Sequence, residues 1–474
     1  MEDCKDAPYS EEYYDLLVSY LRLENEYLPE DCIQNIDKDF NVVYLQSAGL
    51  PKLDIDQYTY SAIPKCFTTL DEEALQAGGI IKVQSQPNLA LRGQGVLIGF
   101  VDTGIDYQNE VFRNSDGSSR ILRIWDQSIQ SGDTPEGFLY GTEYTKEQID
   151  MALLTDAPLR VVPHRDEEGH GTFMAGLAAG SEKLSEKFAG VAPYAQIAMV
   201  KLKPAKEYLR RFYYIPEGAK AYQENDIMAG VLYLVSLAKK RQQPLVICLG
   251  LGTNAGSHRG GLPLARMLEE LGSSVGITIV AGTGNETSRG HHFEGQISSE
   301  SGYEDVEIRV AEGENGFFLE LWASAPETYS IAIRSPNGEV IPRIYVRPGR
   351  IEILNFALAQ TRVEVSYRLS VTGTGEFLAL LRFINITPGV WTVRVYNDLF
   401  ITGHYHMWLP IESFLRQDTV FLRPSEFITL TSPSDAANVI SVSNYNYQNN
   451  SVYLYSGRGY TTDCLLYTSD AADD

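Results

Sequence analysis

The central part of the chain contains short, predominantly apolar runs that do not alternate with polar residues, separated by amphipathic stretches. Such runs occur at residues 96–101, 197–202, 244–249 and 277–282. Unalternating apolar strands are buried on both faces, which is typical of a parallel sheet covered by helices. Apolar residues at helical spacing also predict two helices, at 227–238 and 264–271. The pattern therefore predicts an α/β fold, a doubly wound domain with a mostly parallel sheet.

The pattern changes after about residue 290, where short strands follow one another closely. Candidate strands lie at 306–310, 317–321, 330–333, 363–367 and 390–395. Turn signals such as Asn337-Gly338 and Pro388-Gly389 separate them, which is typical of a β-sandwich. Residues 428–433 and 438–443 resume the α/β character. We therefore expect an all-β domain, inserted into one continuous α/β domain.

Residues 1–80 alternate acidic, tyrosine-rich and apolar stretches. Apolar residues at helical spacing predict a helix within residues 13–21, and residues 40–45 predict a strand. This segment is expected to be a small α/β unit. We therefore divide the chain into five parts. Residues 1–80 form the N-terminal unit, and residues 81–290 form the first part of the α/β domain. Residues 291–415 are the β-rich insertion, residues 416–463 the second part of the α/β domain, and residues 464–474 a tail.

Acidic residues clearly exceed basic ones. The chain has 62 Asp and Glu against 39 Lys and Arg, a formal net charge of −23. This charge repels nucleic acid and anionic membranes, so we expect neither as a partner. The five cysteines are odd in number and widely spread, which favours reduced thiols over a disulfide framework or a metal-binding knuckle. No secretory signal is visible, and no apolar run is long enough to span a bilayer.

Three residues at predicted element ends are candidates for chemistry. His170 stands between glycines at the start of a small-residue helix, Asp102 ends the strand at 96–101, and Asn285 follows the strand at 277–282. Ligands bind beyond the carboxyl ends of parallel strands, so Asp102, residues 250–252 and Asn285 should share one rim. Acyl transfer needs an imidazole base, a carboxylate that orients it and a donor for the oxyanion. Taken alone, Asp102-Thr103-Gly104 is more often a turn than a site, and Asn285 is as readily a turn residue as a donor. A lone histidine such as His170 is more often a satisfied core residue.

Together, residues 99–106, 170–176, 190–195 and 284–285 resemble the subtilisin-like serine protease family (S8). The resemblance implies that Asp102 is the orienting acid, His170 the general base and Asn285 the oxyanion donor. It also implies that Gly250, Leu251 and Gly252 pair with substrate backbone, although the family usually has serine in place of Gly250. The implied partner is a protein or peptide substrate, and no cofactor or metal is implied.

A finer resemblance concerns the acidic N-terminal segment and the β-rich insertion. Both are similar to those of the Csp-type spore-germination proteases, a group that also includes catalytically dead members. The N-terminal unit would then be an intramolecular pro-region. Together with the lack of a visible secretion signal, this resemblance implies a cytoplasmic or spore-associated protein.

The sequence departs from the family at the nucleophile. The family's serine lies in a Gly-Thr-Ser sequence, which occurs nowhere in this chain. Residues 455–461 resemble the stretch before that serine, and residues 464–474 resemble translated sequencing adapter, so we expect a gene truncated before its catalytic serine. The chain is interpreted as a fragment of a serine endopeptidase, inactive as given. The alternative is a catalytically dead binding or signalling module in spore germination, but the presence of both Asp102 and His170 favours the peptidase.

Three further patterns are interpreted as structural. Residues 272–276 fit Gly-x-Ser-x-Gly, but they follow a helix and precede a strand, so we expect a loop and not a hydrolase elbow. His291-His292 and His404-Tyr405-His406 lack a supporting carboxylate cluster, so exposed loop or strand positions are expected and no metal. Asp106 and the acidic run at 166–168 lack the spacing of a calcium loop and are expected to be solvated charge.

Overall fold

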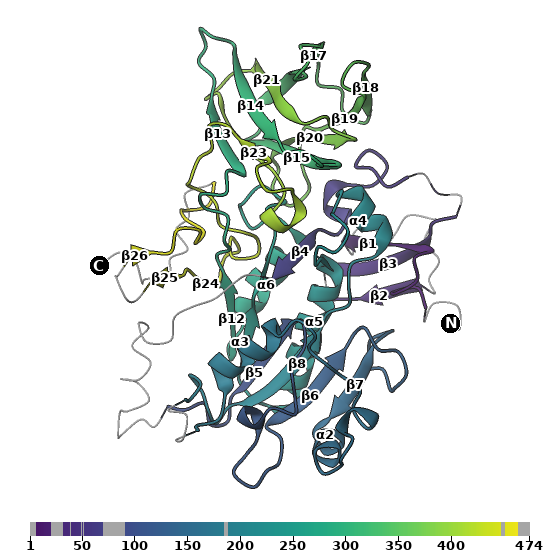
Figure 1. The fold of residues 1–474 in the computed structure, drawn as a ribbon, viewed down its shortest axis with the longest axis vertical. Coiled ribbons are helices and arrows are strands. Elements are labelled where there is room, and N and C mark those ends of the chain that lie inside the picture. The colour runs from purple at the N-terminus through teal and green to yellow at the C-terminus, as the bar shows by residue number, and fades with distance from the viewer. Residues whose placement is uncertain are drawn as a thin grey trace.

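The computed structural model describes residues 6–19, 32–37, 39–48, 50, 52–69, 91–183, 188–446 and 451–462. Its α/β part is built on a seven-stranded sheet of order β24-β12-β10-β5-β8-β6-β7 (Figure 1). Neighbouring strands are parallel except β6 and β7. The strands are β5 (Leu97–Asp102), β6 (Ile121–Asp126), β7 (Thr142–Thr145), β8 (Gln196–Lys201), β10 (Leu245–Leu249), β12 (Ile277–Gly282) and β24 (Ile440–Val442).

Helices cover both faces of this sheet. They are α2 (Lys146–Leu153), α3 (His170–Ala179), α5 (Glu224–Arg241) and α6 (Pro263–Gly272). Helix α4 (Glu207–Phe212) lies away from this sheet (Figure 1), and its Tyr208 ring packs against Tyr14 with ring centroids 4.9 Å apart. Alternate residues of β5 enter two different cores: Leu97 and Val101 pack with residues of α5 and α6, whereas Ile98 and Phe100 pack with residues of α2 and α3. This burial on both faces explains the unalternating apolar runs and confirms the prediction of a mixed α/β fold with a mostly parallel sheet.

Two antiparallel sheets enclose a second core at the top of Figure 1. One has the order β13-β22-β15-β20-β19-β18 and the other β17-β16-β21-β14-β23. The second sheet ends on Val420–Phe421, past the predicted boundary at residue 415. The strands are β13 (His292–Gln296), β14 (Tyr303–Val310), β15 (Gly316–Ala323), β16 (Thr328–Arg334), β17 (Val340–Ile344), β18 (Glu352–Phe356), β19 (Thr361–Arg368), β20 (Phe377–Ile384), β21 (Gly389–Leu399), β22 (His404–Trp408) and β23 (Val420–Phe421).

The N-terminal segment contains a three-stranded antiparallel sheet of order β1-β3-β2, formed by Tyr13–Ser19, Phe40–Gln46 and Ile33–Asn35. The predicted strand at 40–45 is confirmed, but the predicted helix is wrong over Tyr13–Ser19. Asp15, Leu16 and Leu17 are all buried, so this strand is covered on both faces and lacks the alternation that would have identified it. Residues 20 and 21 lie outside the described residues.

The remaining elements are short strands and 3₁₀ turns. They are β4 (Cys66–Thr69), β9 (Tyr222–Gln223), β11 (Leu251–Gly252), β25 (Tyr445–Asn446), β26 (Ser451–Val452) and the 3₁₀ turns η3 (Tyr60–Ala62), η4 (Glu110–Phe112), η5 (Pro158–Arg160) and η6 (Glu412–Phe414). Cys32 is disulfide-bonded, so the expectation of reduced thiols is wrong for this residue, because sequence spacing does not report spatial proximity. Cys66 is a buried thiol, and burial raises its pKa.

A row of rings lines the face of the sandwich that meets the α/β domain. His292 of β13 lies opposite Trp408 of β22, and their ring centroids are 4.8 Å apart. His291, His292 and His406 are buried, so the prediction of exposed positions is wrong for these three, whereas the side chain of His404 is 38% exposed. Burial lowers the pKa of His292 to about 3 and that of His406 well below its ordinary value, so both imidazoles are neutral.

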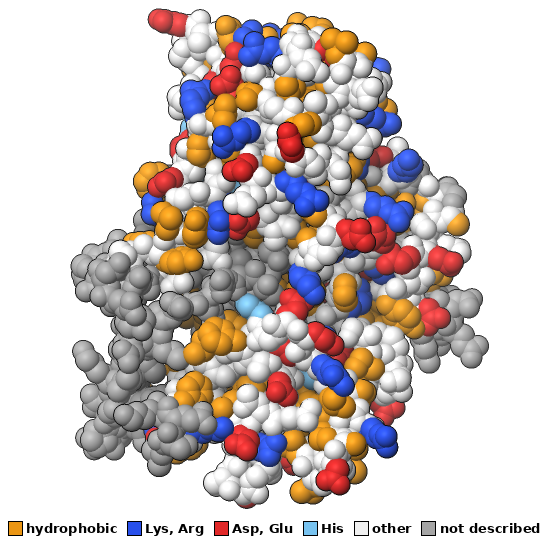
Figure 2. All heavy atoms as spheres, in the orientation of Figure 1, with side chains coloured by type: hydrophobic (Ala, Val, Ile, Leu, Met, Phe, Trp, Pro, Cys, Tyr) orange, Lys and Arg blue, Asp and Glu red, His pale blue; other side chains and the backbone are white. Residues whose placement is uncertain are grey.

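The distribution of charged side chains on the surface differs from what the net charge alone would suggest. Acidic and basic side chains are interspersed over the face seen in Figure 2, so the net charge of −23 is not gathered into one acidic patch on that face. Among the described residues, every helix is too short or too polar for a bilayer-spanning segment.

Candidate active site

The carboxylate of Asp102 contacts the imidazole of His170 at the carboxyl edge of the parallel sheet. Asp102 is the last residue of β5 and His170 the first of α3. The distance from Asp102 Oδ1 to His170 Nδ1 is 2.7 Å. Asp102 is 1% exposed, and the His170 side chain is 16% exposed. A carboxylate in this position accepts the Nδ1 proton, which selects the tautomer whose lone pair is on Nε2.

Asp166 fixes the start of the His170 helix. Its carboxylate accepts hydrogen bonds from the Thr103 hydroxyl at 2.8 Å, from the Gly169 amide at 2.9 Å, and from the amide and hydroxyl of Thr172 at 2.9 and 2.6 Å. Burial would raise the pKa of Asp166, but these bonds outweigh it and lower that pKa. The expectation of solvated charge is therefore wrong for Asp166, because its oxygens bond the free amides of a helix N-terminus.

Two glycines permit the close approach of acid and base. A Cβ on Gly171 would lie 2.2 Å from the carbonyl oxygen of Gly104 and 3.1 Å from Asp102 Oδ1. A Cβ on Gly250 would lie 2.8 Å from His170 Cε1 and 3.4 Å from Asp102 Oδ2. Gly250, which follows β10, is thus in contact with both members of the pair. A side chain at either position would require backbone or ring to shift.

The two residues after Gly250 are already paired with extended backbone. Leu251 and Gly252 form β11, which pairs antiparallel with β4 in the register Leu251 to Thr69 and Gly252 to Thr68. On its other side β4 pairs antiparallel with β9. A strand of the N-terminal segment therefore lies between two strands of the α/β domain, in the path where substrate backbone was predicted to pair.

Asn285 lies at the same sheet edge, in the loop that follows β12. The register Leu249 to Ala281 puts this loop beside Gly250. The loop is held by backbone hydrogen bonds, from the Thr283 amide to Val442 at 3.0 Å and from the Gly457 amide to Gly284 at 2.8 Å. Asn285 itself is half-buried. The rim predicted from the strand ends thus contains Asp102, Gly250 and Asn285.

Glu286, next to Asn285, belongs to a buried network that sequence reasoning missed. Its carboxylate forms hydrogen bonds with His291 Nδ1 at 2.6 Å, the Asn254 side-chain amide at 2.8 Å and the Glu412 backbone amide at 3.0 Å. Burial would raise the pKa of Glu286, but the His291 contact and these bonds lower it. The network fixes the residue beside the predicted oxyanion donor.

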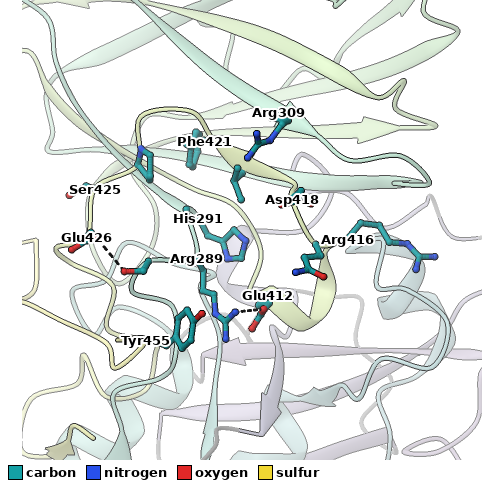
Figure 3. A pocket seen from close by; sticks show the side chains of 15 residues that line it. Arg289, His291, Arg309, Glu412, Arg416, Asp418, Phe421, Ser425, Glu426 and Tyr455 are labelled. Atoms are coloured by element: carbon teal, nitrogen blue, oxygen red, sulfur yellow. Dashed lines mark hydrogen bonds and ion pairs between the residues drawn. The ribbon is translucent and has the colours of Figure 1, made fainter. Parts of the chain in front are cut away.

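A cavity of about 440 Å³ adjoins this network (Figure 3). His291 and Arg289 point into it, and Arg289 pairs with Glu412 at 2.6 Å while its guanidinium lies 3.6 Å from the centre of the Tyr455 ring. The cavity therefore has mixed charge. It lies at the junction of the α/β domain and the sandwich, since Arg309 of β14 also lines it.

A second imidazole–carboxylate pair supports the loop after Asp102. His164 Nδ1 lies 2.6 Å from Asp126 Oδ2, and both side chains are fully buried. His164 Nε2 accepts the Ile105 amide proton at 3.1 Å. Burial would raise the pKa of Asp126, but bonds from His164 and Ser128 lower it. No sequence signal distinguished this histidine, because it lacks the flanking glycines and the small-residue helix that mark His170.

The Gly-x-Ser-x-Gly segment at 272–276 is a loop, as predicted. It connects α6, which ends at Gly272, to β12, which begins at Ile277. The Ser273 hydroxyl donates to the carbonyl of Glu270 at 2.6 Å and is exposed. The serine of the pattern itself is Ser274, whose backbone amide donates to the carbonyl of Leu271 at 3.0 Å in the turn after the helix. The segment runs from helix to strand and therefore does not form a nucleophile elbow.

Comparisons with known proteins agree with this geometry. Residues 93–327 match the family model of the subtilase family, peptidase S8. Two subtilisin-like proteases of Arabidopsis thaliana, SBT2.2 and SBT3.8, are 28% identical over 126 residues and 31% identical over 140 residues. These alignments cover 23% and 25% of this chain but only 15% and 17% of the plant proteins.

The likeness to one solved structure extends further along the chain. The structure of the CspB protease of Clostridium perfringens matches with a TM-score of 0.72 and 28% sequence identity. The match covers 83% of this chain and 77% of that one, so it includes much more than the parallel sheet. Over residues 93–327, this chain belongs to the subtilase family.

Proposed function

We propose that this protein is a subtilisin-type serine endopeptidase in which Asp102 orients His170 and His170 is the general base. The 2.7 Å contact between Asp102 Oδ1 and His170 Nδ1 carries the proposal. In this scheme His170 Nε2 takes the proton of a serine hydroxyl as the serine oxygen attacks the peptide carbonyl. His170 then gives that proton to the leaving amine, and water hydrolyses the acyl-enzyme.

Asn285 is proposed as the donor to the oxyanion of the tetrahedral intermediate. Its support is its position at the sheet edge beside Gly250, on a loop anchored through Glu286. An amide N–H fixed before the reaction stabilises developing negative charge without reorganisation, and loss of one such donor costs about 10²–10³-fold in kcat.

The nucleophile is proposed to be a serine in a Gly-Thr-Ser segment that these 474 residues do not contain. The chain as printed then has an acid and a base but no hydroxyl to activate. Support comes from residues 455–461, which resemble the stretch before that segment. The Gly457 amide also bonds the loop of Asn285.

We further propose that the N-terminal segment is a pro-region that occupies the substrate path. The pairing of β4 with Leu251 and Gly252 supports this role. The segment is anchored by a buried ion pair of 2.6 Å between Asp15 and Lys206. A second anchor is the Tyr60 hydroxyl, which donates to the buried carboxylate of Glu320 at 2.7 Å. Such desolvated contacts fix one docking geometry, as expected of an intramolecular inhibitor.

The test compares the printed chain with the product of the native reading frame, called here the serine-bearing protein. The printed chain is expected not to hydrolyse peptides. The serine-bearing protein is expected to react covalently with a fluorophosphonate, and His170→Ala should abolish the labelling. Mass spectrometry should also detect cleavage between Thr69 and Leu91 in the wild type and an intact chain in His170→Ala. Peptidase activity of the printed chain that Asp102→Ala removes would contradict the proposed nucleophile.

A catalytically dead binding or signalling module in spore germination is the second candidate. It is favoured by the occupied strand position at β11. The same experiment separates the two functions. A native reading frame without the serine, or a folded serine-bearing protein that fluorophosphonate does not label, would support the module and exclude the peptidase.

A further inference from the structure

Two neighbouring strands of the sandwich bring together three side chains that can ligate a metal ion. Glu294 of β13 lies directly opposite His406 of β22, and His404 lies two residues before His406 on the same face. One ligating atom from each side chain lies within 4.8 Å of the other two. Neither strand contains this donor set alone, so it exists only in the folded register.

The orientation of His406 is fixed by its neighbour. His292 Nδ1 lies 2.7 Å from the carbonyl oxygen of Phe427, so this nitrogen carries the proton. His292 Nε2 then accepts, and the atom that faces it at 3.1 Å is His406 Nδ1, which donates. The Nε2 lone pair of His406 remains for a ligand. Metal-binding histidines commonly donate their other ring N–H in this way, which fixes the tautomer and the ring orientation.

We propose that Glu294, His404 and His406 form a binding site for a divalent transition-metal ion, Zn²⁺ in the first instance. Two imidazoles and one carboxylate are a donor set that zinc uses, whereas calcium and magnesium prefer oxygen ligands alone. Three protein ligands leave a further position for water. The proposal is independent of peptide hydrolysis.

The required movement is small. Donors 4.8 Å apart at the corners of an equilateral triangle lie about 2.8 Å from its centre, against about 2.0–2.2 Å in a zinc site. His404 Nε2 and Glu294 Oε1 already lie 2.9 Å apart. Their side chains are 38% and 39% exposed, so an ion can enter from solvent and both side chains can rotate toward it.

A metal ion bound here would link the terminal strand of this sheet to its neighbour. In its sheet β13 is the terminal strand and pairs with β22 alone. It begins just after His291, which bonds the Glu286 carboxylate beside Asn285. A bound ion would add a second link between β13 and β22 and so stabilise the strand that leads from the loop of the candidate site.

Zinc titration of the metal-stripped 474-residue chain tests the proposal. Isothermal titration calorimetry should detect one Zn²⁺ per chain with a micromolar or tighter dissociation constant, and zinc should raise Tm. His404→Ala and Glu294→Gln should each weaken binding at least tenfold, because each removes one donor. Both positions are partly exposed, so these variants should fold, and the Tm of each metal-free protein checks that they do.

Glu300→Gln is the matched control, because it removes an exposed carboxylate of the same domain that is outside the donor set. Its zinc affinity should equal that of the wild type. Cobalt provides an independent measurement: Co²⁺ should give a visible absorption band in the wild type and in Glu300→Gln, but not in His404→Ala. Absence of stoichiometric binding, or equal affinity of His404→Ala and the wild type, would overturn the proposal and leave Glu294 and His404 as a cross-strand ion pair.

Discussion

Two imidazole–carboxylate pairs among the described residues, Asp102–His170 and Asp126–His164, have nearly equal geometry but differ in exposure. Asp102 contacts His170 at 2.7 Å and Asp126 contacts His164 at 2.6 Å, each through Nδ1. The His164 pair is fully buried, and its Nε2 accepts a backbone amide proton. The His170 pair lies at the sheet rim with a partly exposed ring. The carboxylate contacts Nδ1 in both pairs, so the pairs differ in the exposure of the ring and not in the contact itself. Under the proposed function, this exposure is what suits His170 to act as the general base.

The largest expected difference between the pairs is in catalysis. In the serine-bearing protein, Asp102→Asn should lower kcat by about 10⁴-fold, because the amide favours the wrong imidazole tautomer. Asp126→Asn should change kcat by less than about tenfold in the protein that folds, since this pair supports the loop without reaching substrate. Steady-state kinetics with a peptide substrate measures both. Equal losses would contradict the distinction between the two pairs.

The next largest difference is in stability. His164→Ala should lower the free energy of unfolding by about 3–5 kcal/mol, because it removes the His164 partner from the buried Oδ2 of Asp126 and from the buried Ile105 amide. His170→Ala should cost less, because water can fill the space of a partly exposed ring and solvate Asp102. Urea denaturation of the two variants measures the difference. A greater loss in His170→Ala would show that the His164 pair is not the structural one.

A smaller effect is expected from the packing that brings His170 to Asp102. Gly171→Ala should destabilise by about 1–3 kcal/mol, because its Cβ would lie 2.2 Å from the carbonyl oxygen of Gly104. Gly176 of the same helix has no such neighbour within 4 Å of a Cβ. Gly176→Ala is therefore the matched control and should raise stability by up to about 1 kcal/mol. Thermal unfolding of both variants measures the effect, and equal behaviour would exclude the close approach.

Local patterns in the sequence predict the parallel sheet well, because a strand buried on both faces records its environment in its own residues. The same reasoning fails at β1, where burial on both faces gave spacing that resembled a helix. Asp102 and His170 are predictable because each stands at the end of an element with glycines beside it. Their roles remain predictions that the proposed variants test.

Contacts between distant residues leave no local signal. The Asp126–His164 pair joins residues 38 positions apart, and the Glu294–His404 pair joins residues 110 positions apart. The interpretation of the histidine pairs as metal-free rested on the lack of a helical His-x-x-x-His spacing or a carboxylate cluster. The antiparallel register of β13 and β22 places the Glu294 carboxylate beside His404 and His406, and only the fold specifies the register.

The smallest expected effect comes from Asp166, which connects the His170 helix to the Asp102 loop, and it depends on pH. Its pKa is lowered in the fold from an ordinary value of 3.8, so its carboxylate stabilises the folded state above that pH. The stabilisation is lost as the pH falls through the lower folded-state pKa. Asp166→Asn should therefore cost about 1–2 kcal/mol at pH 7 and progressively less below pH 4.

Urea denaturation at pH 7 and at acid pH measures this dependence, with Asp156→Asn as the control because that carboxylate is exposed. The control should shift the free energy of unfolding by less than about 0.5 kcal/mol at either pH. A loss in Asp166→Asn that does not depend on pH would mean that its hydrogen bonds do not require the charge. The His170 helix would then be held by neutral hydrogen bonds and packing, without a contribution from the charge of Asp166.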